Sequence, residues 1–257
     1  MAKTALITGS TSGIGLATAK AFAKKGYNIV FNGLEENGAE IAAGVAAEFK
    51  IKHLFSPANL MNPPEIKAMI AQALQEFGTI EVVVNNAGIQ FVSPLEDFPD
   101  DKWDAIISVN LTAAFHVTKA LWKQMKDNKF GRVINISSAH GLVASPFKSA
   151  YVAAKHGLIG FTKVLALEGG AFGITANAIC PGYVHTPIVD KQIPDQMKTH
   201  NMTEQEVIDN VFLGEHAIKE FISTDTIAAA ILFLADNEAS ATITGIALPL
   251  DAGWTAH

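Results

Sequence analysis

The chain has 257 residues, 49% of them hydrophobic, which is ample for a large buried core. Its formal net charge is −6, and Lys and Arg are scattered rather than gathered in a stripe, which argues against a nucleic-acid-binding protein. No apolar run approaches the roughly 18 to 20 residues that a membrane span needs. Cys180 is the only cysteine, so an internal disulfide is excluded and a reducing compartment, the cytoplasm, is expected. The histidines lack the spacing of a metal site, and no metal is expected.

Short β-rich runs alternate with longer helical patterns, which is typical of βαβ units and a parallel sheet. The strand-like runs include, in chain order, Thr4–Thr8, Asn28–Phe31, Val82–Asn85, Arg132–Ser137, Thr175–Cys180 and Ile246–Leu250. Between them, apolar residues recur at three- and four-residue spacing, as in Leu158, Phe161 and Leu165. No repeat, low-complexity tract or linker interrupts the pattern, so residues 1–257 are expected to form a single α/β domain.

The segment of residues 186–221 breaks this alternation. It is polar, contains Pro187 and Pro194, and carries two short helical patterns, Pro194–His200 and Thr203–Leu213. Because it follows the strand that ends at Cys180, it should lie at the carboxyl edge of the sheet, where open α/β folds bind ligands. We expect a mobile lid; a simple surface insertion is the alternative.

A glycine-rich run, Thr8–Gly15, joins the first expected strand to the first expected helix. Glycines let the backbone approach a pyrophosphate, and the N-terminus of the helix supplies free N–H groups. Such a turn can also simply end a strand, but its place at the start of a βαβ unit favours a dinucleotide site. The residues expected to contact the cofactor in this loop are Gly9, Thr11, Ser12, Gly13, Ile14 and Gly15.

The end of the second strand, around Phe31–Leu34, should distinguish NAD from NADP. NADP needs a cation for its 2′-phosphate, and neither this stretch nor Ser10–Ser12 contains Lys or Arg. The acidic residue that would positively select NAD is also missing, because Gly33 stands near its expected place. NAD is therefore expected from the absence of a phosphate anchor. After the third strand, Asn59 and Leu60 are candidates for contact with the adenine, although Asn59 could equally be a turn residue.

Tyr151 and Lys155 lie four residues apart at the start of an expected helix, so their side chains share one face. A free tyrosine has a pKa near ~10, and a tyrosine that acts as a base near neutrality needs that pKa lowered by roughly three units, or about 4 kcal/mol. Lys155 and a cationic nicotinamide ring can supply the field. Ser138, at the end of an apolar strand, offers a hydroxyl to the reacting oxygen. Asn110 is polar inside an apolar helical pattern, which indicates a structural or relay role.

Together these residues resemble the short-chain dehydrogenase/reductase family over essentially the whole chain. The motifs that carry the resemblance are Thr8–Gly15, Asn85–Gly88, Asn110, Ser138, Tyr151 with Lys155, and Pro181-Gly182 followed by Thr186. The resemblance implies a Rossmann-like, doubly wound parallel sheet of about seven strands with a small helical lid. It also implies a homotetramer, which suits a chain with only 17% charged residues.

The same resemblance implies roles for individual residues. Tyr151 would be the general acid/base, and Lys155 would also hold the nicotinamide ribose. Ser138 would polarise the carbonyl, and Asn110 would take part in a water relay. Further residues expected to line the cofactor are Asn86, Ala87, Gly88, Pro181, Gly182, Val184 and Thr186.

Four polar side chains flank these segments: Gln90, His140, Lys148 and Gln192. All are hydrogen-bond donors or potential donors. An acidic protein that gathers such groups at the entrance of one site can bind a small carboxylate there. Taken singly, Lys148 and Gln192 could equally be solvated surface residues.

With the C-terminal Asp251–Ala256, these segments are similar to family members that oxidise 3-hydroxybutyrate to acetoacetate. This likeness implies that the four polar residues bind the carboxylate and that Trp254 closes the site around the methyl end. Tyr183 is expected in the same pocket, where tryptophan is commoner, which leaves the pocket size open. The expected reaction is the reversible NAD-linked oxidation of (R)-3-hydroxybutyrate. The alternatives are another small hydroxy acid, a sugar or a 3-oxoacyl substrate, and a non-catalytic nicotinamide-binding sensor.

Overall fold

The computed structural model describes residues 2–236 and 238–256, without the side chains of residues 187, 188, 191, 192, 195, 199 and 200. In this part of the chain, seven strands form one sheet in the order β3-β2-β1-β4-β5-β6-β7. All neighbouring strands run parallel. The strands are β1 (Thr4–Ile7), β2 (Asn28–Asn32), β3 (His53–Ser56), β4 (Val82–Asn85), β5 (Gly131–Ile136), β6 (Ile174–Pro181) and β7 (Ala247–Leu250). The prediction of a doubly wound parallel sheet is confirmed.

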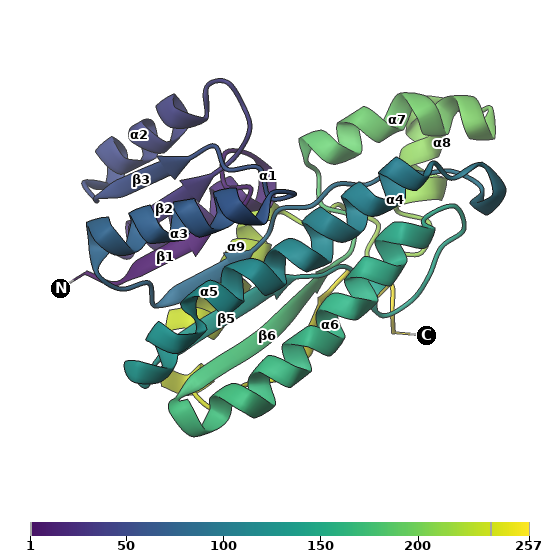
Figure 1. The fold of residues 1–257 in the computed structure, drawn as a ribbon. Helices are drawn as coiled ribbons and strands as arrows, with labels where there is room; N and C mark the ends of the chain where they lie inside the picture. Colours follow the sequence, from purple (N-terminus) through teal and green to yellow (C-terminus); the bar gives the residue numbers. More distant parts are fainter. Residues whose placement is uncertain (1, 237, 257) are drawn as a thin grey trace.

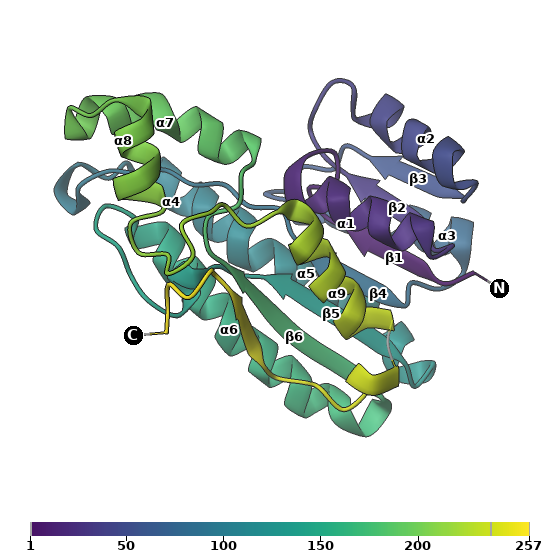
Figure 2. The ribbon, with the colours of Figure 1, turned by 180° about the vertical axis from the view of Figure 1, so that it is seen from behind.

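Helices cover both faces of the sheet (Figures 1 and 2). One face carries α1 (Gly13–Lys24), α2 (Gly38–Phe49) and α9 (Thr224–Asp236), and the other carries α3 (Pro63–Phe77), α5 (Ala113–Asp127) and α6 (Ser149–Gly169). Ile7 belongs to the hydrophobic core on the first face and Leu6 to the core on the second. Successive strand residues point to opposite faces, so strands buried on both sides read as continuous apolar runs.

Between β6 and α9 the chain leaves the sheet and forms α7 (Pro187–His200), α8 (Glu204–Val207) and a π-helical stretch, Ile208–Phe212. Figure 1 shows α7 and α8 above α4 (Asp100–Ile107), outside the two helix layers. The first of these helices begins at Pro187, earlier than the expected Pro194, because proline suits the first turn of a helix. Val189, Val207 and Phe212 form a small core of their own. Whether this segment moves as a lid stays a prediction.

Within the described residues, none of the helices combines the length and apolarity needed to cross a membrane. The same residues contain no group of three or more His, Cys, Asp and Glu side chains that could hold a metal ion.

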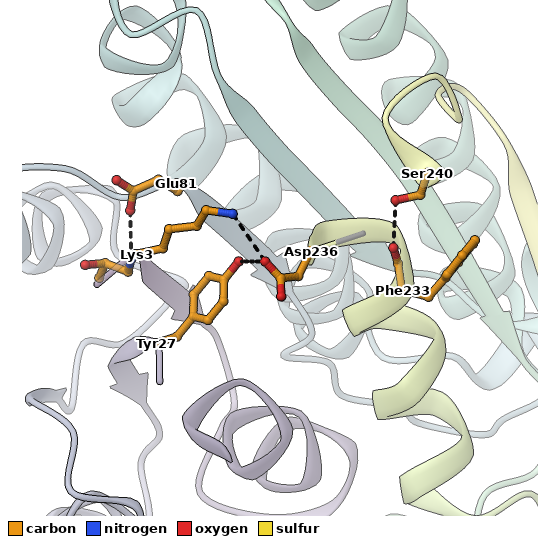
Figure 3. Close-up of polar contacts among 7 residues, drawn as sticks. Lys3, Tyr27, Glu81, Phe233, Asp236 and Ser240 are labelled. Atoms are coloured by element: carbon orange, nitrogen blue, oxygen red, sulfur yellow. Dashed lines mark hydrogen bonds and ion pairs between the residues drawn. The ribbon is translucent and has the colours of Figure 1, made fainter. Parts of the chain in front are cut away.

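A polar cluster ties the start of the sheet to the end of α9 (Figure 3). The Tyr27 hydroxyl donates to Oδ1 of Asp236 at 2.5 Å, and Nζ of Lys3 lies 3.2 Å from the same oxygen. The Tyr27 ring packs edge-on against Phe22 with 5.0 Å between ring centroids. Burial, and then the hydrogen bond to Asp236, raise the pKa of Tyr27, so its hydroxyl keeps its proton and remains a donor.

We predict that Tyr27→Phe lowers the free energy of unfolding by about 1.5 kcal/mol, because a hydrogen bond to a charged group is lost while the ring still packs. Thermal and urea denaturation of the two proteins measure the difference. An unfolding free energy equal to that of the wild type would mean that Lys3 alone satisfies Asp236.

Candidate active site

The loops that follow β1, β4, β5 and β6 meet at the carboxyl edge of the sheet, which in open α/β folds is the ligand-binding edge. The first turn of α6 lies at the same edge and carries Tyr151. Lys155 follows one turn later, and its Nζ lies 5.4 Å from the centre of the Tyr151 ring. The Lys155 ammonium donates to the carbonyl of Ile136 at 2.7 Å, so the end of β5 holds it in place. Ser138 lies just beyond β5, and its side chain acts to lower the pKa of Tyr151.

Burial dominates the electrostatics of this group. It raises the pKa of Tyr151 to about 12; the Ser138 side chain acts in the opposite direction, and Tyr183 adds to the rise. Burial also lowers the pKa of Lys155 to about 8. A phenol that must give up a proton near neutrality therefore needs positive charge close to it, and Lys155 is the described cation beside its ring.

Asn110 lies on a π-helical stretch, Ser108–Thr112, between α4 and α5, and it is buried. Its Oδ1 accepts from the backbone N–H of Ile89 at 2.9 Å, and its Nδ2 donates to the Ile89 carbonyl at 2.8 Å. A Cβ at Gly88 would lie 2.8 Å from Asn110 Oδ1, so glycine permits this close approach. The side chain thus shapes the loop after β4, and its part in a water relay stays a prediction.

The glycine loop has the geometry of a pyrophosphate cradle. Gly9 and Gly13 have φ of +60° and +52°, a region that favours glycine. A Cβ at Gly15 would lie 2.0 Å from the Gly9 carbonyl oxygen. Ser12, the N-cap of α1, makes no side-chain capping bond, so N–H groups of the first turn are open to an anion. These residues fit a dinucleotide.

Two other segments run beside this loop. Nδ2 of Asn86 donates to the carbonyls of Thr8 at 2.9 Å and Gly9 at 3.0 Å, which fixes the segment Asn86–Gly88 against it. From the segment Pro181–Thr186, the Thr186 methyl group would lie 3.4 Å from a Cβ at Gly13. The segment Asn86–Gly88 and Thr186 therefore lie beside the glycine loop, together with Ile14 in the first turn of α1.

The candidate adenine contacts lie after β3. Asn59 accepts from the backbone N–H of Met61 at 2.9 Å, so its side chain serves the turn, and Leu60 is buried. A role for either residue in adenine binding stays a prediction.

Glu35 is a residue that the sequence reasoning missed. Its carboxylate accepts hydrogen bonds from the hydroxyls of Thr11 and Ser12, the latter at 3.2 Å. Burial works to raise the pKa of Glu35, but the hydrogen bonds from Thr11, the backbone and Ser12 outweigh it and leave the pKa low, so the group is ionised. Gly33 allows the contact, because a Cβ there would lie 2.6 Å from Glu35 Oε2. Its spacing from the glycine motif, which ends at Gly15, could have identified Glu35 in the sequence. Nucleotide-binding βαβ units typically have an acidic residue about 20 positions beyond that motif.

Residues of the expected carboxylate pocket lie near the Tyr151 ring. Lys148, the N-cap of α6, is buried and donates from Nζ to the Tyr183 hydroxyl at 3.0 Å. The His140 ring lies 6.1 Å from that of Tyr151, 6.4 Å from that of Tyr183 and 4.9 Å from that of Trp254. The structure thus brings together these residues, which lie far apart in the sequence.

The two remaining predicted donors are less closely tied to this group. Nε2 of Gln90 is buried and has no hydrogen-bond partner among the described residues. It is therefore free to donate to an acceptor on a ligand. The contacts of the described residues do not link Gln90 to Lys148 or His140. Gln192 lies on α7, and its side chain is outside the part of the chain that the structure describes.

Burial also sets the charges in this pocket. It lowers the pKa of Lys148 to about 8 and that of His140 to about 3, the latter with help from the charges of Lys148 and His156. His140 is therefore neutral near pH 7, with one ring N–H, and its Nε2 is hydrogen-bonded to the Ser145 hydroxyl at 2.9 Å. Burial raises the pKa of Tyr183 to about 12, so Lys148 is the one cation among His140, Lys148 and Tyr183.

Two further residues, His216 and Asp251, support the wall of the pocket. The backbone N–H of Tyr183 donates to Nε2 of His216 at 3.3 Å, and Nδ1 of His216 then donates to the Glu220 carbonyl at 3.2 Å. Asp251 accepts from Thr255 N–H at 2.9 Å and from its hydroxyl at 2.6 Å, which fixes the turn that carries Trp254. The bond between His216 and Tyr183 joins residues 33 positions apart, so no local pattern could have predicted it, whereas the bonds of Asp251 lie within one turn of the chain.

Comparisons with known proteins agree with this geometry. The family model for the short chain dehydrogenase matches residues 3–197. A Rhizobium meliloti protein named D-beta-hydroxybutyrate dehydrogenase is 51% identical, with all of both chains covered. One of the same name from Cupriavidus necator is 46% identical, covering 99% of this chain and 98% of the relative. A crystal structure of an actinorhodin polyketide ketoreductase variant with NADPH superposes with a TM-score of 0.94 at 30% identity, over 100% of this chain and 98% of the other. The chain belongs to the short-chain dehydrogenase family.

Proposed function

We propose that the protein is an NAD-dependent dehydrogenase that reversibly oxidises (R)-3-hydroxybutyrate to acetoacetate. The observation that carries the proposal is the buried Lys148 ammonium beside the Ser138, Tyr151 and Lys155 group, in a protein whose net charge is negative. A buried cation needs an anionic partner, and a carboxylate on the substrate supplies one. The two relatives named D-beta-hydroxybutyrate dehydrogenase support the same substrate.

In the oxidation, the Tyr151 phenolate takes the proton of the C3 hydroxyl group, and the Ser138 hydroxyl donates to the same substrate oxygen. The positive charge of Lys155 favours the phenolate. Bound NAD supplies the acceptor for the hydride that leaves C3. In the reverse direction Tyr151 returns its proton to the carbonyl oxygen of acetoacetate.

The carboxylate anchors act by positioning. A short acid held at Lys148, His140 and Gln90 can turn only one face of C3 toward the nicotinamide, and Gln192 would add a donor from α7. Fixing the reacting groups in this way removes a large entropic part of the barrier.

The preference for NAD rests on Glu35. Its ionised carboxylate, held over the glycine loop by Thr11 and Ser12, can accept from a ribose hydroxyl and repels a 2′-phosphate. At an effective dielectric constant of about 20, two like charges 4 Å apart repel by about 4 kcal/mol.

The protein is further proposed to be a cytoplasmic homotetramer, and the face formed by α5 and α6 supports a contact between copies of the chain. Phe115, Val164 and Leu167 are 41%, 49% and 86% exposed. Together with Trp122 and Phe161, the first two line a hollow of about 610 Å³. Exposed apolar surface of this kind usually marks a protein–protein contact.

We predict that Tyr151→Phe lowers kcat about 10²- to 10⁴-fold, the usual contribution of a general acid/base, because phenylalanine cannot exchange a proton. NADH should still bind, as measured by its fluorescence, because the ring and Lys155 remain. Turnover at the wild-type rate would rule out Tyr151 as the proton-transfer group.

We predict that Lys148→Ala raises the KM for acetoacetate about 10- to 100-fold with little change in kcat, because a charge-assisted hydrogen bond is lost. In the wild type, KM should also rise above about pH 8, where Lys148 becomes neutral. This rise of KM with pH should be absent from the variant. Lys163→Ala, an exposed lysine on the same helix, is the matched control. Equal KM values in the three proteins at neutral pH would contradict the anchor role.

We predict that Glu35→Gln reduces the preference for NADH over NADPH at least about 10-fold, because the repulsion of the 2′-phosphate is removed. Calorimetric titration of each reduced cofactor measures this without turnover, and Glu36→Gln is the neighbouring control. A preference as strong as that of the wild type would assign cofactor selection to other residues.

A further inference from the structure

Among the described residues, Tyr183 is the one whose side chain contacts that of Lys148, the proposed substrate anchor, and it joins Lys148 to the wall of the pocket. Its ring stacks on Trp254 with 5.4 Å between centroids and an interplanar angle of 9°, and it meets Phe212 edge-on at 4.9 Å. Its backbone N–H is tied to His216. The position of the Tyr183 hydroxyl is therefore fixed by the C-terminal tail, by the segment after α8 and by the end of β6, which Tyr183 follows closely in the chain.

Lys148, in contrast, carries its charge on a flexible stem of four carbons. Such a side chain loses about 2 kcal/mol of rotamer entropy when it is immobilised. In the structure the ammonium lies 3.0 Å from the Tyr183 hydroxyl oxygen, and 5.3 Å from the centre of the ring. One ammonium N–H is used in this bond, and two remain for another acceptor.

The other described polar groups of the pocket do not hold Lys148. The Nε2 atom of His140 is engaged by Ser145, and the described part of the chain gives Lys148 no ion pair with a carboxylate. The Tyr183 hydroxyl is therefore the group that sets where the ammonium points. Neither phenylalanine nor tryptophan could do so, because the first has no polar atom and the second only donates.

We propose that Tyr183 is a positioning residue for carboxylate recognition: its hydroxyl accepts from Lys148 and holds the ammonium, in advance of binding, where the substrate carboxylate arrives. This inference rests on the proposed function, and it extends that function by assigning part of the preference for acids over neutral ketones to a residue outside the proton-transfer group. Holding the anchor before binding spares the substrate the cost of ordering the lysine.

The test compares Tyr183→Phe with the wild type on two ketones, acetoacetate and its neutral methyl ester, with NADH as the reductant. For acetoacetate, KM should rise about 10-fold with kcat within about 2-fold, since a hydrogen bond to a charged group is lost. For the ester, both constants should stay within about 2-fold of the wild type, because the ester has no charge for Lys148 to hold. Tyr27→Phe is the matched control: it removes the same hydroxyl at a remote site and should leave both KM values unchanged.

Each other outcome has a definite meaning. An equal loss on both ketones, or an unchanged KM for acetoacetate, would overturn the positioning role. A wild type that reduces the ester as efficiently as the acid would instead overturn the carboxylate pocket, and with it the proposed function. NADH binding reports whether each variant is folded; if Tyr183→Phe fails that check, Tyr183→Met, which keeps an apolar side chain against Trp254 without a comparable acceptor, carries the same comparison.

Discussion

The buried bond between the Lys155 ammonium and the Ile136 carbonyl is the contact on which the geometry of the site depends. A charge taken out of water is costly unless it is hydrogen-bonded, and this carbonyl, at the end of β5, meets part of that cost. The same bond fixes α6 against the sheet, and α6 also carries Tyr151 one turn earlier and Lys148 at its N-cap. Tyr151 and Lys148 are thus held at a constant separation by one helix and one strand.

The two ends of the site carry opposite charges. Glu35 places a carboxylate over the glycine loop, and Lys148 places a cation beyond Tyr151. Each is a single charge held by neutral hydroxyl groups, from Thr11 and Ser12 at one end and from Tyr183 at the other. A charge held in this way has few other arrangements, so it can discriminate between ligands. Overall net charge says little about which ligand a local site prefers.

The substrate end is built from parts of the chain that do not belong to the sheet. Val184 forms an isolated bridge with Ile222, which joins the two ends of the segment that contains α7 and α8. Trp254 reaches the pocket from the C-terminal turn, where Asp251 fixes it. A sheet and glycine loop of this kind can therefore serve many reactions, while these peripheral segments adapt the pocket to one substrate class.

The sequence by itself determined the architecture and the pairing of Tyr151 with Lys155 on one helix face. Strand and helix periodicities are local properties, and Tyr151 and Lys155 are four residues apart on one helix, so their relation needs no tertiary information. Only the tertiary structure decided the rest. Glu35 reaches Thr11 from a different loop, and His216 supports Tyr183 from beyond α8, because the packing of separate βα units brings them together. Burial, which sets the charge states of His140 and Lys148, is likewise a property of the folded chain and not of any one segment.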